Sequence, residues 1–347
     1  MNGRFRIPRP LVESLATIGV GLVAGGLLML VFGNNPLRAY RALFVGAFGS
    51  LEDVLETLAF ATPLMLTGLT FAVGVRAGLF NIGAEGQMYL GAVGATFIAG
   101  TFALPPLVHV AAATLVAMLC GALWALPPAL LKIWRGVHEV ISTIMCNWIA
   151  FHLSTYLVIY FLTGAGRADS TRPALPTARY PVLFAESTLT AVVFVAVAFC
   201  LAVYLYLWGT RAGYELRLAG ENPEAARYAG VHAGRAMLLS FGIGGLAAGL
   251  AGASQIIGRP PAWSLYATLG NVTTLGFDGI GVALVGRSHP LGGILAAFLF
   301  GALAHGGRFM EYHAGVLSEL VRAINGLIVL TLAVPELWAI TRRRLGR

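Results

Sequence analysis

Long apolar runs separated by short polar segments constrain this chain more than any other feature. About 20 apolar residues are needed for a helix to cross a bilayer. Charged residues make up only 11% of the chain, whereas about a quarter of a soluble domain is charged. We therefore predict an all-α polytopic membrane protein, a single transmembrane domain over residues 1–347. Its roughly ten predicted spans lie at 11–32, 54–75, 79–100, 106–131, 139–163, 187–209, 236–257, 270–286, 290–306 and 316–340.

The eighth and ninth of these runs are short and interrupted by glycine or proline, so we expect some spans to be broken or re-entrant. Lysine and arginine are concentrated in alternate connecting segments, including 1–10, 132–138, 211–235 and 341–347. Because positive charge is enriched in cytoplasmic loops, both termini and the 211–235 segment are expected in the cytoplasm. This topology accounts for the net charge of +8 without a nucleic-acid partner and predicts a multi-pass protein of the cell membrane.

The 211–235 segment is a polar, arginine-bearing stretch between two apolar runs. Asn222 is a favourable N-cap, Pro223 suits the first helical position and Gly230 can end a helix. The pattern predicts a short surface helix on a cytoplasmic loop, suited to contact with another protein. The candidate contact residues are Asn222, Pro223, Glu224, Ala225, Ala226, Arg227, Tyr228 and Gly230.

Polar side chains within the apolar runs indicate a second kind of site. The third run holds Asn81, Glu85 and Gln87 among four glycines, and interrupted helices of this kind are tolerated only inside protein or beside a cavity. An intramembrane glutamate is either a functional group or a structural hydrogen-bond partner, and both interpretations of Glu85 remain open. The candidate pathway residues are Asn81, Glu85, Gln87, Glu139, Thr143, Asn147 and Asp278.

Sequence motifs for enzymatic chemistry are missing. A phosphate-binding loop needs Gly-Lys-Ser/Thr, but Lys132 is the only lysine and lies between Leu131 and Ile133. The three cysteines have no metal-ligand spacing. We expect neither a metal site nor an enzyme, and an intramembrane enzyme is a weak alternative.

Four blocks of sequence carry a family resemblance. They are GLFNIGAEGQMYLGA (78–92), EVISTIMCNWIA (139–150), LRLAGENPEAARYAGV (216–231) and GFDGIGVALVGRSHPLGGILAAFLFGAL (276–303). Together they resemble the permease subunits of bacterial ABC importers for branched-chain amino acids, simple sugars and nucleosides. The segment 81–86 is most similar to the nucleoside-type branch.

The resemblance implies partners for this chain. Such permeases pair with a second permease, often a different gene product, and with two ATP-binding cassette ATPase subunits. An extracytoplasmic substrate-binding protein delivers the solute. The 222–230 helix would be the coupling helix, and ATP and Mg would be bound by the partner ATPase, with no cofactor on this chain. Permeases for sugars or branched-chain amino acids are alternatives, as is an ion-driven carrier using Glu85 and Asp278 as relay groups.

Overall fold

A computed structural model describes residues 9–164, 169–317, 319–324, 326–327 and 330–331 of the chain. Regular structure in these ranges is helical, apart from three isolated β-bridges. The chain divides into two compact units, residues 1–57 with 302–347, and residues 58–301. The helices α3 (Leu51–Arg76) and α12 (Pro290–Ala314) each contribute residues to both units.

The smaller unit contains α1 (Arg9–Val31) and α2 (Pro36–Phe48). The side chain of Asn35 accepts hydrogen bonds from the first amides of α2, and Pro36 occupies the first helical turn, which is the expected start signal. The Tyr40 hydroxyl donates to the Leu22 carbonyl at 2.5 Å and ties α2 to α1.

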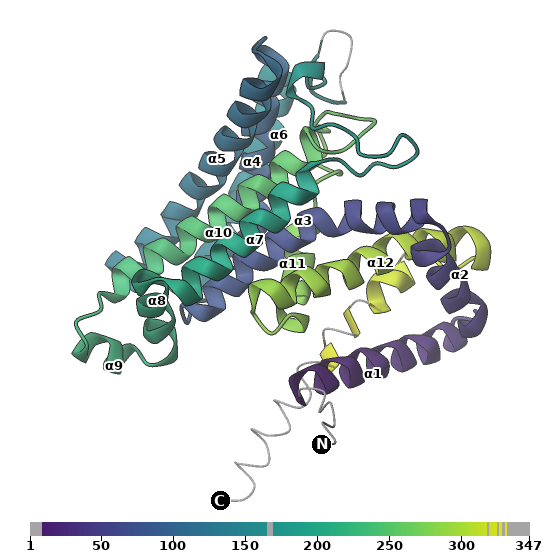
Figure 1. The fold of residues 1–347 in the computed structure, drawn as a ribbon, viewed down its shortest axis with the longest axis horizontal. Helices are drawn as coiled ribbons and strands as arrows, with labels where there is room; N and C mark the ends of the chain where they lie inside the picture. Colours follow the sequence, from purple (N-terminus) through teal and green to yellow (C-terminus); the bar gives the residue numbers. More distant parts are fainter. Residues whose placement is uncertain (1–8, 165–168, 318, 325, 328–329, 332–347) are drawn as a thin grey trace, which may run out of the picture. The chain divides into compact units, whose positions relative to one another are not determined.

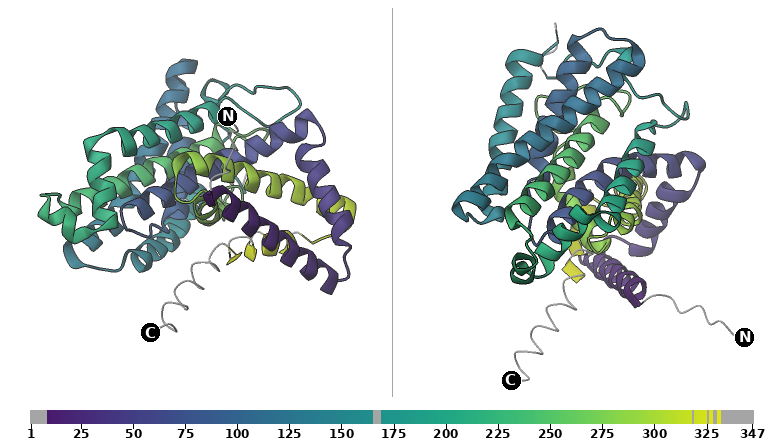
Figure 2. Two further views of the ribbon diagram at one scale, coloured as in Figure 1. Left: turned by 60° about the horizontal axis from the view of Figure 1, so that its bottom comes forward. Right: turned by 60° about the vertical axis from the view of Figure 1, so that its left-hand side comes forward.

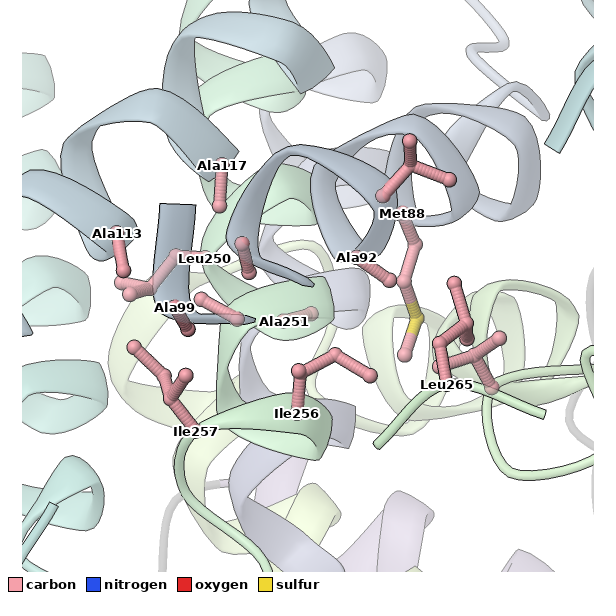
Figure 3. Packing of buried hydrophobic residues seen from close by; sticks show 14 of the residues in the cluster. Met88, Ala92, Ala99, Ala113, Ala117, Leu250, Ala251, Ile256, Ile257 and Leu265 are labelled. Atoms are coloured by element: carbon pink, nitrogen blue, oxygen red, sulfur yellow. The ribbon is translucent and has the colours of Figure 1, made fainter. Parts of the chain in front are cut away.

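The larger unit is built around α4 (Ala84–Thr101), α5 (Pro106–Arg135) and α10 (Ala233–Ile256), which run side by side (Figures 1 and 2). Glycines allow this close packing. A Cβ atom added to Gly91 would lie 2.6 Å from the Gly249 Cα, and one added to Gly245 would lie 2.6 Å from the Gly121 carbonyl. Small residues let membrane helices approach closely. The surrounding core is mostly alanine and leucine (Figure 3).

The other elements of this unit complete the bundle. The helix α6 (Glu139–Leu157) continues into a π-helical turn, η1 (Val158–Leu162), and a 3-10 turn, η2 (Pro176–Ala178), follows. Then come α7 (Val192–Gly209), α8 (Arg211–Glu221), α9 (Pro223–Tyr228) and, after α10, the short α11 (Leu275–Val285).

Six helical segments of the described residues are long and apolar enough to cross a membrane. They are Leu51–Arg76, Pro106–Arg135, Glu139–Leu162, Val192–Gly209, Ala233–Ile256 and Pro290–Ala314. The predicted all-helical membrane class is confirmed. The predicted run 79–100 becomes helical only at Ala84, and the run 270–286 only at Leu275, which leaves an eleven-residue helix. Most of the predicted last span and both chain ends lie outside the described residues.

Candidate functional site

Residues 77–83 form a non-helical connection between α3 and α4, here called the break. Gly78 has φ +72°, a left-handed conformation that favours glycine. Buried backbone groups outside a helix must find other hydrogen-bond partners. Asn147 of α6 supplies them, because its Oδ1 accepts from the Gly86 amide at 2.9 Å and its Nδ2 donates to the Ile82 carbonyl at 2.9 Å.

Asn81 closes the same break from within. Its Oδ1 accepts from the Gly83 amide at 3.0 Å and from the Gln87 Nε2 at 3.3 Å. Both side chains are about 1% exposed, yet Asn81 Nδ2 and Gln87 Oε1 find no hydrogen-bond partner among the described residues. Unpaired buried polar atoms are uncommon in folded proteins and costly, so this break holds unused hydrogen-bonding capacity.

Glu85, buried at 2% exposure, joins α4 to α11. Its carboxylate accepts from the Thr274 amide at 2.5 Å, from the Gly276 amide at 2.7 Å and from the Tyr89 hydroxyl at 2.6 Å. A carboxylate at a helix N-terminus satisfies free amides and favours the helix dipole. Glu85 therefore caps α11 from another helix. These three hydrogen bonds are the contacts expected if Glu85 has a structural role.

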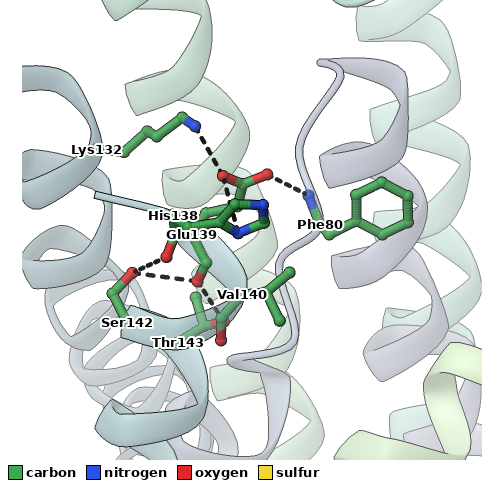
Figure 4. A network of polar contacts seen from close by, with 7 residues as sticks. All are labelled: Phe80, Lys132, His138, Glu139, Val140, Ser142 and Thr143. Carbon is green, nitrogen blue, oxygen red and sulfur yellow. Dashed lines mark hydrogen bonds and ion pairs between the residues drawn. The ribbon is translucent and has the colours of Figure 1, made fainter. Parts of the chain in front are cut away.

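Glu139 organises the N-terminus of α6 (Figure 4). Its Oε2 lies 2.9 Å from the Lys132 Nζ at the end of α5, and its Oε1 accepts from the Phe80 amide at 3.4 Å. Thr143 Oγ1 donates back to the Glu139 carbonyl at 2.7 Å. The only lysine of the chain thus connects α5, α6 and the break.

Six of the seven candidate pathway residues are brought together at or beside this break. Asn81, Glu85, Gln87, Glu139, Thr143 and Asn147 are all buried. Asp278 differs, because it is exposed in the first turn of α11. The assignment of these residues to a translocation pathway stays a prediction. Among the described residues, no three metal-ligating side chains lie close enough together to hold a metal ion.

The predicted surface helix forms as α9. Asn222 Oδ1 accepts from the Ala225 amide at 3.0 Å, Pro223 begins the helix, and Gly230 follows its end with φ +77°. Ala226 is buried against Ala219 and Ala236, whereas Tyr228 is 95% exposed. Glu224, Ala225 and Arg227 are also exposed. The helix is anchored by one face and presents the others outward; its coupling role stays a prediction.

Two contacts join the 211–235 segment to the break. The helix α8 places Gly220 against Gly78, so that a Cβ added to Gly220 would lie 2.6 Å from the Gly78 amide nitrogen. Trp208, at the end of α7, has the guanidinium groups of Arg76 and Arg217 over its ring at 5.5 and 5.2 Å.

Several functional contacts were missed from the sequence. Arg76 also donates to the carbonyls of Ser288 and Arg287 at 2.8 and 3.2 Å, which joins α3 to the turn between α11 and α12. A local signal existed for Tyr89, because it stands one turn beyond Glu85. The contacts of Trp208 with Arg76 and Arg217 gave no such signal, since these residues come from separate parts of the chain.

Long apolar helices, a connection between α3 and α4 held by buried polar side chains and an exposed capped helix define a multi-pass membrane protein of the transporter class. Residues 54–333 match the family described as branched-chain amino acid transport system / permease component, and the chain belongs to this family. It is a permease-type protein of the cell membrane.

Three relatives extend this match over nearly the whole chain. The chain is 38% identical to the guanosine ABC transporter permease protein NupP of Bacillus subtilis, covering 94% of each chain. It is 33% identical to the nucleoside ABC transporter permease protein NupB of Lactococcus lactis, covering 94% of this chain and 91% of the relative. It is 34% identical to the glucose ABC transporter permease protein TsgB13 of Haloferax volcanii, covering 95% and 88%. The predicted family resemblance is confirmed.

Proposed function

We propose that this chain is the permease subunit of an ABC importer that translocates a nucleoside or a related simple sugar. The names of the relatives, which include guanosine, nucleoside and glucose permeases, support this substrate class. An extracytoplasmic binding protein would deliver the solute and supply most of the affinity. A path of scattered amide and hydroxyl groups would then suffice.

In this proposal ATP and Mg are bound by separate ATPase subunits, and this chain binds no cofactor. The observation that carries the proposal is the geometry of α9. A short capped helix is anchored through Ala226 and exposes Glu224, Arg227 and Tyr228, as a contact for a cytoplasmic motor requires. The loop that carries α9 would lie in the cytoplasm, as would both termini. The whole chain would form a single transmembrane domain of about ten spans.

Movement of α9 would reach the membrane interior through α8. Gly220 lies against Gly78, two residues beyond the end of α3, and the guanidinium groups of Arg217 and Arg76 both lie over the Trp208 ring. The segment beyond Gly78 is the break that contains Asn81 and leads to Glu85. A shift of α8 would therefore be transmitted to the candidate pathway residues and to α11.

Reconstitution with the partner ATPases, a second permease and the binding protein tests the coupling role. We expect Glu224→Arg and Arg227→Glu to abolish ATP-dependent nucleoside uptake while the chain still inserts and stays folded. Glu186→Arg and Arg41→Glu make the same charge changes at other exposed positions and should leave uptake unchanged. Normal coupled uptake in both α9 variants would contradict the coupling role. Uptake that needs no ATPase but stops when the proton gradient collapses would instead favour the ion-driven carrier.

A further inference from the structure

One face of α6 and η1 carries four exposed aromatic side chains, each four residues after the last. They are Trp148, His152, Tyr156 and Tyr160, here called the aromatic stripe, and three of them are 59%, 51% and 69% exposed (Trp148, Tyr156 and Tyr160). Four residues are about one helical turn. The Trp148 and His152 rings stack with centroids 6.4 Å apart, and those of Tyr156 and Tyr160 lie 4.9 Å apart.

Two other spans of this unit expose leucine side chains at regular spacing. The helix α5 presents Leu115, Leu119 and Leu123 at the same one-turn spacing, and α7 presents Leu201 and Leu205. These hydrocarbon faces suit lipid. The helix α6 also exposes Ile141, Met145 and Ile149 beside the stripe, so the aromatic stripe is one part of its exposed surface.

The position of His152 indicates that the aromatic stripe does not face lipid. It is exposed near the middle of the 24-residue span Glu139–Leu162. Ionisable side chains at this depth almost always face the bundle interior or a water-filled cavity, because their exposure to lipid is unfavourable. The opposite side of α6 already holds Asn147 against α4, so His152 points toward space that this unit does not fill.

We propose that the aromatic stripe, rather than the buried amide groups packed on the opposite side of α6, lines the translocation pathway and stacks on the heterocyclic base of the transported nucleoside. This inference rests on the proposed function and names the residues that contact the base. Aromatic side chains stack on every base through its π-face, and the imidazole and phenol groups can hydrogen-bond to the base edge. Rings repeated every turn offer successive weak sites, as transport through a pore requires.

Cysteine accessibility in the assembled transporter tests this placement. Cys120, Cys146 and Cys200 are first replaced by alanine, and guanosine uptake by this cysteine-free parent is measured. Single variants Trp148→Cys and Tyr156→Cys are then treated with a charged, membrane-impermeant thiol reagent. We expect both to react, and guanosine, but not ribose, to slow the reaction about fivefold or more. Leu119→Cys, on the leucine face of α5, should not react.

The outcomes separate the possible occupants of this face. No reaction at either stripe position means that lipid or the second permease covers it, and overturns the proposal. Reaction that guanosine does not slow means a water-filled path without base contact, and also overturns it. If the wild-type chain in the same assembly transports no nucleoside, this inference fails, and the proposed function fails with it only if no simple sugar is transported either; nucleoside uptake with unprotected cysteines contradicts the inference alone.

Ring substitutions add a quantitative check. We expect Trp148→Ala and Tyr156→Ala to reduce nucleoside uptake about tenfold, in line with the loss of one stacking contact. Trp148→Phe and Tyr156→Phe keep a ring and should stay within about twofold of the parent. Equal effects of alanine and phenylalanine, at equal amounts of folded protein, would contradict a stacking role.

Discussion

The backbone of Gly220 in α8 lies directly against the backbone of Gly78, two residues beyond the end of α3. An added Cβ on Gly220 would lie 2.6 Å from the Gly78 nitrogen, and one on Gly78 would lie 3.0 Å from the Gly220 Cα. Real Cβ atoms essentially never come closer than 3.0 Å to such neighbours. The segment that carries the exposed α9 therefore touches the start of the helix break without an intervening side chain.

Gly220→Ala should separate these two backbones. Overpacking of a tight contact typically costs about 1–3 kcal/mol, so we expect a lower midpoint of thermal unfolding in detergent and reduced coupled uptake. Gly242→Ala is the matched control, because a Cβ at Gly242 of α10 meets nothing within 4 Å. Equal unfolding midpoints for the two variants would show that the contact is not tight.

Asn147→Ala should destabilise the break. The substitution leaves the Gly86 amide and the Ile82 carbonyl without their partner, and an unsatisfied buried group costs about 1–3 kcal/mol. Ser154→Ala on the same helix is the control, since the buried Ser154 hydroxyl has no partner among the described residues. Thermal unfolding should show a clear loss for Asn147→Ala and no loss for Ser154→Ala. A loss of the same size in both would argue against the clamp.

Glu85→Ala should loosen the start of α11. The amides of Thr274 and Gly276 both donate to the Glu85 carboxylate, so their hydrogen exchange should accelerate when it is removed. Tyr89→Phe removes only the hydroxyl that donates to Glu85 and should leave those two amides protected. Unchanged protection in Glu85→Ala, measured by hydrogen–deuterium exchange, would show that the cap is dispensable.

Features set by neighbouring residues could be predicted from the sequence. The helix α9 follows from a cap, a proline and a terminal glycine within nine residues. Glycines beside polar groups predicted an interrupted third span, but only residues 79–83 are non-helical and α4 runs unbroken from Ala84 to Thr101. The helix α8 was missed because its polar composition resembles a loop. Its start signals are the Thr210 cap and the Arg211–Glu215 pair at 2.9 Å.

Long-range pairings could not be predicted in the same way. Glu85 and its partner Gly276 are 191 residues apart, and a single sequence contains no signal that pairs them. The same reason explains α11. The predicted run 270–286 counted apolar residues, but Thr274 has φ +74° and Glu85 caps the helix just beyond it. The sequence therefore could not decide whether Glu85 is a functional group or a structural hydrogen-bond partner, because its partners become neighbours only in the fold.

Stability should fall at mildly acidic pH because of His289, in the turn before α12. Burial, and secondly the nearby charge of Arg76, lower the pKa of His289 below its ordinary value of 6.5. Its Nδ1 also accepts from the Leu291 amide at 3.3 Å, which requires a neutral nitrogen. The folded protein thus holds the unprotonated imidazole against Trp208, with ring centroids 4.6 Å apart.

The sign follows from proton linkage. As pH falls through about 6.5, the unfolded chain takes up a proton at this position before the folded chain does, so the free energy of unfolding decreases. The contribution is present above pH 6.5 and is lost progressively below it. We expect the midpoint of thermal unfolding of the wild-type protein to drop further between pH 7.5 and 5.5 than that of His289→Gln, whose side chain cannot titrate. Identical drops in the two proteins would show that His289 is not a source of the acid sensitivity.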